Sequence, residues 1–134
     1  MDSSKTEQET FSLVKRAKSF THAWRGICIV MKTTHNAWIQ LTFLVIAAFF
    51  GMYFKISTTD WLLIALAAAL VLCAEAFNTA IEIDIDLTSP DYHPYARDTK
   101  DVAAGAVLLA AIAAAVIGLV IFVPHLLSVA EFIS

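Results

Sequence analysis

The chain has 134 residues, 59% of them hydrophobic and 16% charged, and its formal net charge is −3. These values indicate one small domain that is too apolar for a typical soluble protein. Six of the nine Lys and Arg residues precede residue 33, and this asymmetry argues against a nucleic-acid-binding face. We expect no secretory signal peptide, because no apolar core follows the polar start. We also expect no disulfide between Cys28 and Cys73, which lie far apart in apolar surroundings.

Residues 10–32 combine an apolar helical period with basic residues at other angular positions. Phe20, Trp24 and Ile27 belong to the apolar set. This pattern predicts an amphipathic helix that lies on the membrane surface. Its basic residues are able to meet lipid headgroups or nucleotide phosphates, and the sequence alone favours headgroups; the residues concerned are Lys15, Arg16 and Lys18.

Three apolar runs follow, and each is long enough to cross a bilayer. The expected spans are residues 37–54, 61–87 and 96–124. Thr58 or Thr59, followed by Asp60, is expected to cap the second span. Two prolines break residues 88–95 into a loop, and small residues dominate the third span, which permits close approach of helices. The fold class is therefore an all-α membrane protein with one surface helix and three transmembrane helices.

Basic residues cluster on one side of these spans. Besides the N-terminal segment, the loop at 88–95 is followed by Arg97 and Lys100, whereas the opposite side carries Lys55 alone. The positive-inside bias predicts that the N-terminus and the Pro-containing loop are cytoplasmic and that the C-terminus lies outside.

Four polar residues in the second span are spaced 3, 4 and 4 and therefore form one stripe on a helix: Glu75, Asn78, Glu82 and Asp86. The stripe follows an apolar run of residues 61–74. Glu75 lies about 22 Å along the helix from Asp60, so we expect it below the headgroups, where an ionisable residue is a functional hypothesis. The alternative for Asp84 and Asp86 is that both are simply solvated.

The side chains of the stripe and of the segment that follows it, which includes Asp91, His93, Lys100 and Asp101, are compatible with two classes of function. Carboxylates hold Mg²⁺ together with substrate phosphates, a lysine and a histidine neutralise phosphate charge, and a buried carboxylate accepts a proton from a hydroxyl. Such a set suits phosphoryl transfer from a nucleotide to a lipid alcohol. A proton or ion pathway in a small channel or transporter subunit is the competing reading, because intramembrane acids serve there too.

Two motifs resemble the prokaryotic integral-membrane diacylglycerol kinase family, which includes undecaprenol kinases. The first is Glu75-x-x-Asn78-Thr79-Ala80-Ile81-Glu82-x-x-x-Asp86, and the second runs from Asp91-Tyr92-His93 to Lys100-Asp101-x-Ala103-Ala104-Gly105-Ala106-Val107. The resemblance covers nearly the whole chain. It implies a homotrimer in the bacterial cytoplasmic membrane, with active sites between subunits, which uses ATP and Mg²⁺ to phosphorylate a membrane lipid.

The resemblance also implies roles for individual residues. Glu75 would be the general base on the lipid hydroxyl, with Asn78 beside it, and Glu82 would bind Mg²⁺. The nucleotide site would include Lys15, Glu82, Asp86, Asp91, Tyr92, His93, Lys100 and Asp101, and the lipid substrate would meet Lys18, Trp24 and Glu75. Simpler readings stay open: Asn78 bonding across helices, Tyr92 as an interface anchor, and a surface ion pair between Lys100 and Asp101.

Two positions depart from the family pattern. Thr34 stands where members commonly carry an acidic residue that helps to bind metal, and Gln40 stands where some carry an acid. We therefore expect a thinner metal shell or a different lipid preference. The loop and the start of the third span look closer to the undecaprenol kinases than to the enzymes that recycle diacylglycerol, although no residue identifies the lipid tail.

Overall fold

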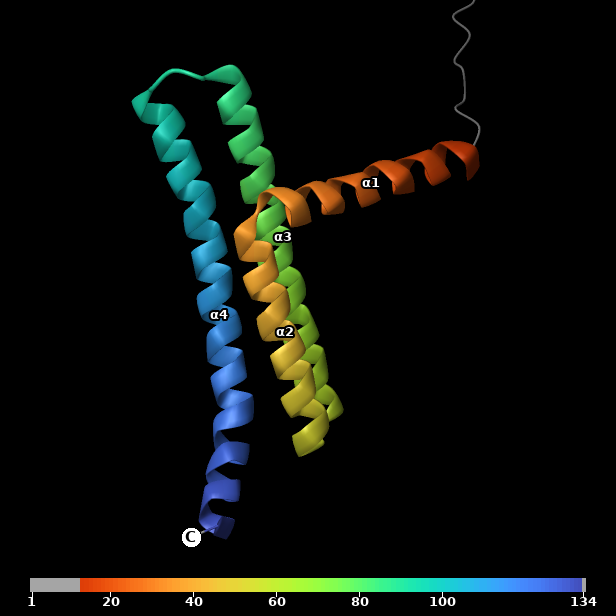
Figure 1. Ribbon diagram of the computed structural model, residues 1–134, viewed down its shortest axis with the longest axis vertical. Helices are drawn as coiled ribbons and strands as arrows, with labels where there is room; N and C mark the ends of the chain where they lie inside the picture. Colours follow the sequence, from red (N-terminus) through yellow and green to blue (C-terminus); the bar gives the residue numbers. More distant parts are fainter. Residues whose placement is uncertain (1–12, 134) are drawn as a thin grey trace, which may run out of the picture.

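The computed structural model describes residues 13–133, and every regular element in that range is an α-helix. The helices are α1 (Leu13–Thr33), α2 (His35–Phe54), α3 (Thr58–Thr88) and α4 (Pro94–Ile133), shown in Figure 1. Helices α2, α3 and α4 are each long and apolar enough to cross a membrane. The predicted class, an all-α membrane protein, is confirmed.

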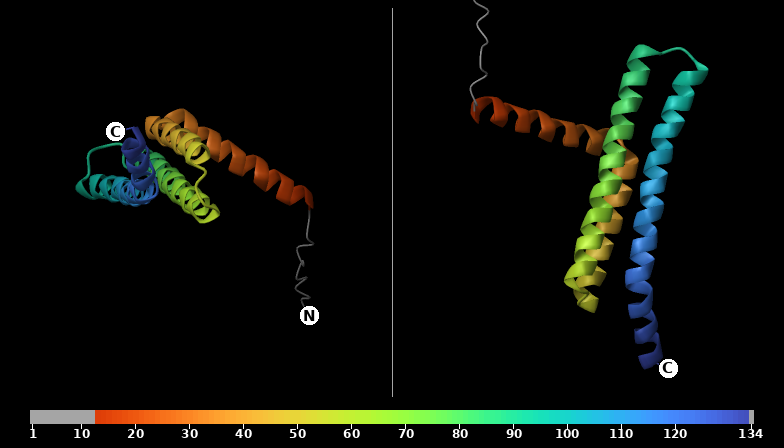
Figure 2. Two further views of the ribbon diagram at one scale, coloured as in Figure 1. Left: turned by 90° about the horizontal axis from the view of Figure 1, so that it is seen from below. Right: turned by 180° about the vertical axis from the view of Figure 1, so that it is seen from behind.

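Helices α2, α3 and α4 run side by side, and α1 projects away from them. Helices α3 and α4 form a long antiparallel pair, and α2 packs mainly on α3 (Figures 1 and 2). Helix α1 runs across the direction of this bundle and projects away from it. Its apolar residues Phe20, Trp24 and Ile27 are 81%, 67% and 55% exposed. Helices with exposed apolar residues of this kind are typical of lipid surfaces.

The turn between α2 and α3 is tightly built. Lys55 adopts a left-handed conformation (φ 52°) at the end of α2. Ser57 caps α3: its hydroxyl accepts from the amide of Asp60, and the Asp60 carboxylate accepts from the amide of Ser57. The expectation that Thr58 or Thr59 is the cap is wrong, because Ser57 closes this reciprocal pair three residues before the acid.

Helix α4 continues through Pro124 to Ile133, beyond the expected end of the third span at residue 124. A proline inside a helix removes the donor for the carbonyl four residues earlier, and membrane helices tolerate this loss where other groups compensate. Here the carbonyl that loses its donor is that of Val120, and one residue further on His125 Nδ1 lies 2.7 Å from the carbonyl oxygen of Ile121. The small apolar cluster at this end of the bundle includes Ile56, Ile64 and Ile121.

Most of the apolar surface is open in the single chain. Phe43, Leu66 and Leu108 are 67%, 67% and 61% exposed. A soluble monomer rarely exposes so much apolar surface. In a membrane protein, lipid tails or further copies of the protein cover such a surface.

Candidate active site

The four residues of the stripe grade from buried to open along α3. Glu75 is fully buried (0% exposed), Asn78 and Thr79 are also buried, Glu82 is half-buried and Asp86 is exposed. The spacing of 3, 4 and 4 places them on one side of the helix. The stripe therefore connects the interior of the bundle to the end of α3 that faces the loop.

Glu75 is held from α2. The side-chain amide of Gln40 donates a hydrogen bond to Glu75 Oε2, with the nitrogen and oxygen 3.2 Å apart. The sequence marked Gln40 only as a departure from the family pattern and did not place it in the site. The sequence indicated a role for Gln40 only weakly, as a polar residue within an apolar run. Periodicity alone did not show which neighbouring helix its side chain faces.

Three buried oxygens in this region have no hydrogen-bond partner among the side chains that the structure describes, residues 18–131: Gln40 Oε1, Glu75 Oε1 and Asn78 Oδ1. The amide nitrogen of Asn78 donates to Glu82 Oε1 at 3.1 Å, one turn along the same helix. Unpaired buried acceptors are rare in folded proteins. Their presence beside a buried carboxylate marks a place that can receive a donor such as a hydroxyl group.

The junction of α1 and α2 (Thr33, Thr34 and His35) lies level with Thr79. The hydroxyl oxygens of Thr34 and Thr79 are 3.0 Å apart, and Thr79 also donates to the carbonyl oxygen of Glu75 at 2.9 Å. At ~1.5 Å of rise per residue, Glu75 lies about 6 Å to one side of this level and Asp86 about 10 Å to the other. The stripe thus crosses the level at which α1 leaves the bundle.

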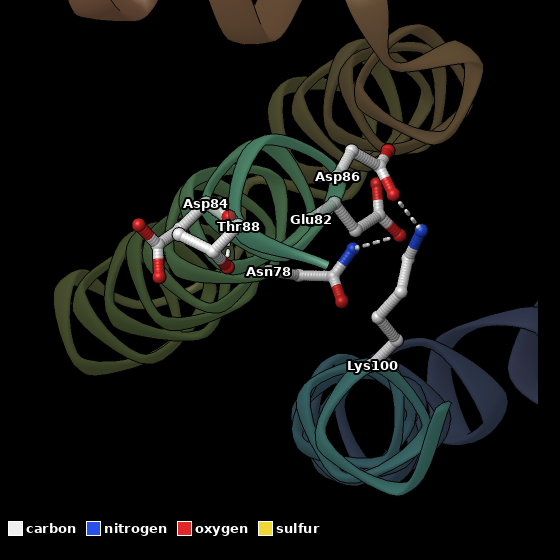
Figure 3. A network of polar contacts seen from close by, with 6 residues as sticks. All are labelled: Asn78, Glu82, Asp84, Asp86, Thr88 and Lys100. Atoms are coloured by element: carbon white, nitrogen blue, oxygen red, sulfur yellow. Dashed lines mark hydrogen bonds and ion pairs between the residues drawn. The ribbon is translucent and has the colours of Figure 1, made fainter. Parts of the chain in front are cut away.

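The outer end of the stripe meets α4. Lys100 Nζ lies 2.7 Å from Asp86 Oδ1, and Figure 3 shows Asn78, Glu82 and Asp86 on the side of α3 that faces Lys100. Asp84 and Thr88 lie on another side, where the Thr88 hydroxyl donates to the Asp84 carbonyl. The suggested ion pair between Lys100 and Asp101 is not the one formed.

Asp101 instead lies near Arg97, with Nε and Oδ2 3.6 Å apart one turn away on the same helix. Neighbouring residues on a helix point about 100° apart, so Lys100 and Asp101 do not face each other. Lys100 points to α3 instead.

A hollow of about 500 Å³ opens between the ends of α3 and α4 and the loop that joins them. Its lining brings together six residues that the sequence assigned to a nucleotide site: Asp86, Asp91, Tyr92, His93, Lys100 and Asp101. Arg97 lines it as well and was not predicted. Tyr92 is 78% exposed at its rim. The hollow is polar, open and of a size that accepts a small organic phosphate.

Two predicted residues lie apart from this arrangement, and a third is not described. Lys18 and Trp24 lie on α1, about 22 Å and 14 Å along its axis from Thr33, and both are exposed. Among the described residues, no hydrogen bond or ion pair joins either side chain to the stripe. The side chain of Lys15 lies outside the described part of the chain.

The donor set fits a magnesium ion held jointly with phosphate. Within residues 13–133, no three His, Cys, Asp or Glu side chains gather closely enough to hold a metal ion by themselves. Mg²⁺ usually binds through one or two carboxylates together with substrate phosphates and water. Glu82 is the carboxylate of the stripe that is partly open and lies between Glu75 and the hollow.

The fold and the site together define an integral membrane protein with a buried carboxylate on the same helix face that leads to a hollow of about 500 Å³ lined by charged and polar side chains. The family model described as prokaryotic diacylglycerol kinase matches residues 21–122. The chain is 38% identical over 109 residues to a Bacillus subtilis protein named undecaprenol kinase, which covers 81% of this chain and 89% of the relative. It is 39% identical over 111 residues to a Synechocystis protein named diacylglycerol kinase, which covers 82% of this chain and 63% of that relative.

The chain belongs to the prokaryotic diacylglycerol kinase family. Membership places it among membrane-embedded lipid kinases, and it confirms the resemblance drawn from the stripe and the Asp91 to Val107 segment.

Proposed function

We propose that this protein transfers the γ-phosphoryl group of ATP to the hydroxyl group of a membrane lipid, with Mg²⁺ as cofactor. The observation that carries the proposal is the change along α3 from a buried carboxylate to an exposed one. A fully buried carboxylate lies on the bundle side of the level at which α1 leaves, and a polar hollow lies on the other side. A lipid alcohol at the membrane surface and a nucleotide from water would therefore meet along one stripe.

Glu75 is the residue best suited to remove the proton of the lipid hydroxyl. Its Oε1 is buried without a partner in the described part of the chain, while Oε2 accepts from Gln40. As Glu75 takes the proton, the lipid oxygen forms a bond to the γ-phosphorus, and the bond from that phosphorus to the β,γ-bridging oxygen breaks. The products are a phosphorylated lipid, ADP and a proton on Glu75, which is then lost to water.

Lys100 and Arg97 are the cations of the hollow that would meet the nucleotide phosphates. Each lies near an aspartate of the same lining, Lys100 near Asp86 and Arg97 near Asp101, so the phosphates would compete with these carboxylates. Magnesium held by Glu82 and the phosphates would neutralise charge on the transferring group. Asn78 donates to Glu82 and so fixes the direction of that carboxylate relative to Glu75.

Undecaprenol is the acceptor that we favour, with diacylglycerol as the other candidate. The sequence of the loop and of the start of α4 supports this order, and the Bacillus relative is named undecaprenol kinase. The Synechocystis relative is named diacylglycerol kinase. The two products would be undecaprenyl phosphate and phosphatidic acid.

We place the protein in the bacterial cytoplasmic membrane as a homotrimer, with the N-terminus and the loop at 88–95 in the cytoplasm. The open apolar faces of α2 and α4 support association with lipid and with further copies. The excess of Lys and Arg at the N-terminus and around the loop supports the orientation.

The decisive experiment supplies purified protein in lipid with labelled ATP and Mg²⁺, offering undecaprenol and diacylglycerol side by side. Label in the prenol supports the favoured acceptor, and label in the glyceride supports the other. Glu75→Gln should abolish transfer, whereas Asp84→Asn, which removes an exposed acid from another side of α3, should retain it.

A folded Glu75→Gln protein that phosphorylates lipid at the parent rate would remove Glu75 from the role of base. Ion flux through reconstituted protein without any ATP turnover would support the channel or transporter subunit instead.

A further inference from the structure

Gln40 joins two spans at a place where neither polar group meets water readily. It lies half-buried on α2, and its amide nitrogen is 3.2 Å from Oε2 of the fully buried Glu75 on α3. An ionised carboxylate only accepts hydrogen bonds, whereas an amide both donates and accepts. The NH₂ group of Gln40 must therefore be the end that faces Glu75.

This contact separates the two oxygens of the Glu75 carboxylate. Oε2 accepts from Gln40, and Oε1 is buried with no partner among the described side chains of residues 18–131. The carboxylate plane is fixed by the first oxygen, so the direction of the second is fixed as well. A base needs this kind of fixed direction, because a misplacement of about 1 Å at a reacting group costs about 10²-fold in rate.

The backbone beneath Glu75 is held from the same end of α2. Thr79 donates its single hydroxyl proton to the Glu75 carbonyl oxygen, so in the contact between Thr34 and Thr79 the donor is Thr34. Thr34 is the N-cap of α2 and yet makes no side-chain capping bond. Its hydroxyl is directed to α3 instead. Glu75 is thus held at two points from the beginning of α2. Gln40 contacts the Glu75 side chain, and Thr34 reaches the Glu75 carbonyl oxygen by way of Thr79.

We infer that Gln40 is a positioning residue for the reaction: it orients the Glu75 carboxylate so that Oε1 faces the lipid hydroxyl. The inference rests on the proposed role of Glu75 as base. In this role the NH₂ group of Gln40 contacts Glu75 Oε2 and takes no part itself in the transfer of the proton or of the phosphoryl group. Its loss therefore lowers kcat and leaves the binding of both substrates largely intact.

The test compares substitutions at one position. Gln40→Met keeps the length of the side chain and removes the donor, so kcat should fall about 10- to 100-fold while KM for lipid and for ATP stays within about threefold. Gln40→Asn keeps the amide but shortens its reach and should lose a similar factor. Gln40→His places an N–H donor at the same number of bonds from the backbone and should restore most of the rate.

Thr42→Val is the matched control, because Thr42 is exposed two residues further along α2 and its hydroxyl donates only to the Trp38 carbonyl of its own helix. It should keep the parent kcat. A kcat for Gln40→Met within twofold of the parent, or a change confined to KM, would overturn the inference.

A second measurement does not depend on turnover. The side-chain carboxyl resonance of Glu75 in protein labelled with ¹³C-glutamate is identified by its loss in Glu75→Gln. It should move in Gln40→Met and stay in place in Thr42→Val, and an unmoved resonance in Gln40→Met would contradict the contact. Full activity of Glu75→Gln defeats the proposed function, whereas loss in Glu75→Gln with full activity in Gln40→Met defeats only the positioning role.

Discussion

Thr34 and Thr79 are 45 residues apart in the chain, and their hydroxyl oxygens lie 3.0 Å from each other. The contact joins the junction of α1 and α2 to α3, because Thr34 is the residue between α1 and α2. Glu75 lies on one side of this level and Asp86 on the other.

Replacing Thr34 with valine removes the hydroxyl and keeps the shape of the side chain. We expect the free energy of unfolding in detergent to fall by about 0.6 kcal/mol, the average for interhelical hydrogen bonds in membrane proteins. Thr33→Val is the control, since the Thr33 hydroxyl donates within α1 to Ile29. Equal losses in the two variants would show that the contact between helices adds nothing.

Replacing Thr34 with glutamate adds a carboxylate next to the stripe, at the position where the family resemblance implies an acid. Mg²⁺ affinity rises with the number of available carboxylates, so we expect half-saturation of the kinase at a several-fold lower Mg²⁺ concentration. Titration of activity with Mg²⁺ at fixed ATP measures this. An unchanged curve would mean that Thr34 does not limit metal binding.

Gly51 is required by a close approach of the turn between α2 and α3. A Cβ at this position would lie 2.9 Å from two ring carbons of Trp61 and 3.0 Å from Cδ1 of Ile56. Gly51→Ala should therefore destabilise the protein by about 1–3 kcal/mol through overpacking. Gly118→Ala meets nothing within 4 Å and should be neutral or slightly stabilising, which thermal unfolding in detergent will show.

Lys100 is expected to bind phosphate rather than to stabilise the fold. Its partner Asp86 is exposed, and ion pairs of this kind add little to stability. Lys100→Met should raise KM for ATP about tenfold with little change in melting temperature. Lys55→Met removes a lysine at the opposite end of the spans and should leave KM unchanged. A large fall in melting temperature for Lys100→Met would assign a structural role to this lysine.

The orientation of the spans is tested by cysteine labelling in intact cells. In a background of Cys28→Ser and Cys73→Ala, a maleimide that cannot cross membranes should label Thr59→Cys and spare Pro90→Cys. Both positions are exposed at opposite ends of α3. Lysis should make Pro90→Cys reactive. The reverse pattern would place the hollow outside the cell and would be incompatible with ATP as the donor.

Much of this protein was determined by its sequence because helices in lipid are specified locally. Backbone groups must bond within each segment, so an apolar run of sufficient length becomes a span. The period of 3.6 residues then places Glu75, Asn78, Glu82 and Asp86 on one face without any knowledge of neighbours. The residue types on that face already indicated acid–base and phosphate chemistry.

Contacts between helices were decided only by the tertiary structure. No local pattern states that Gln40 turns toward Glu75, that Thr34 bonds to Thr79, or that Lys100 pairs with Asp86 in preference to Asp101. Each depends on the rotation and the relative height of two helices, which packing sets over the whole length of the spans. The continuation of α4 through Pro124 was not predicted either, because a proline more often ends or kinks a helix.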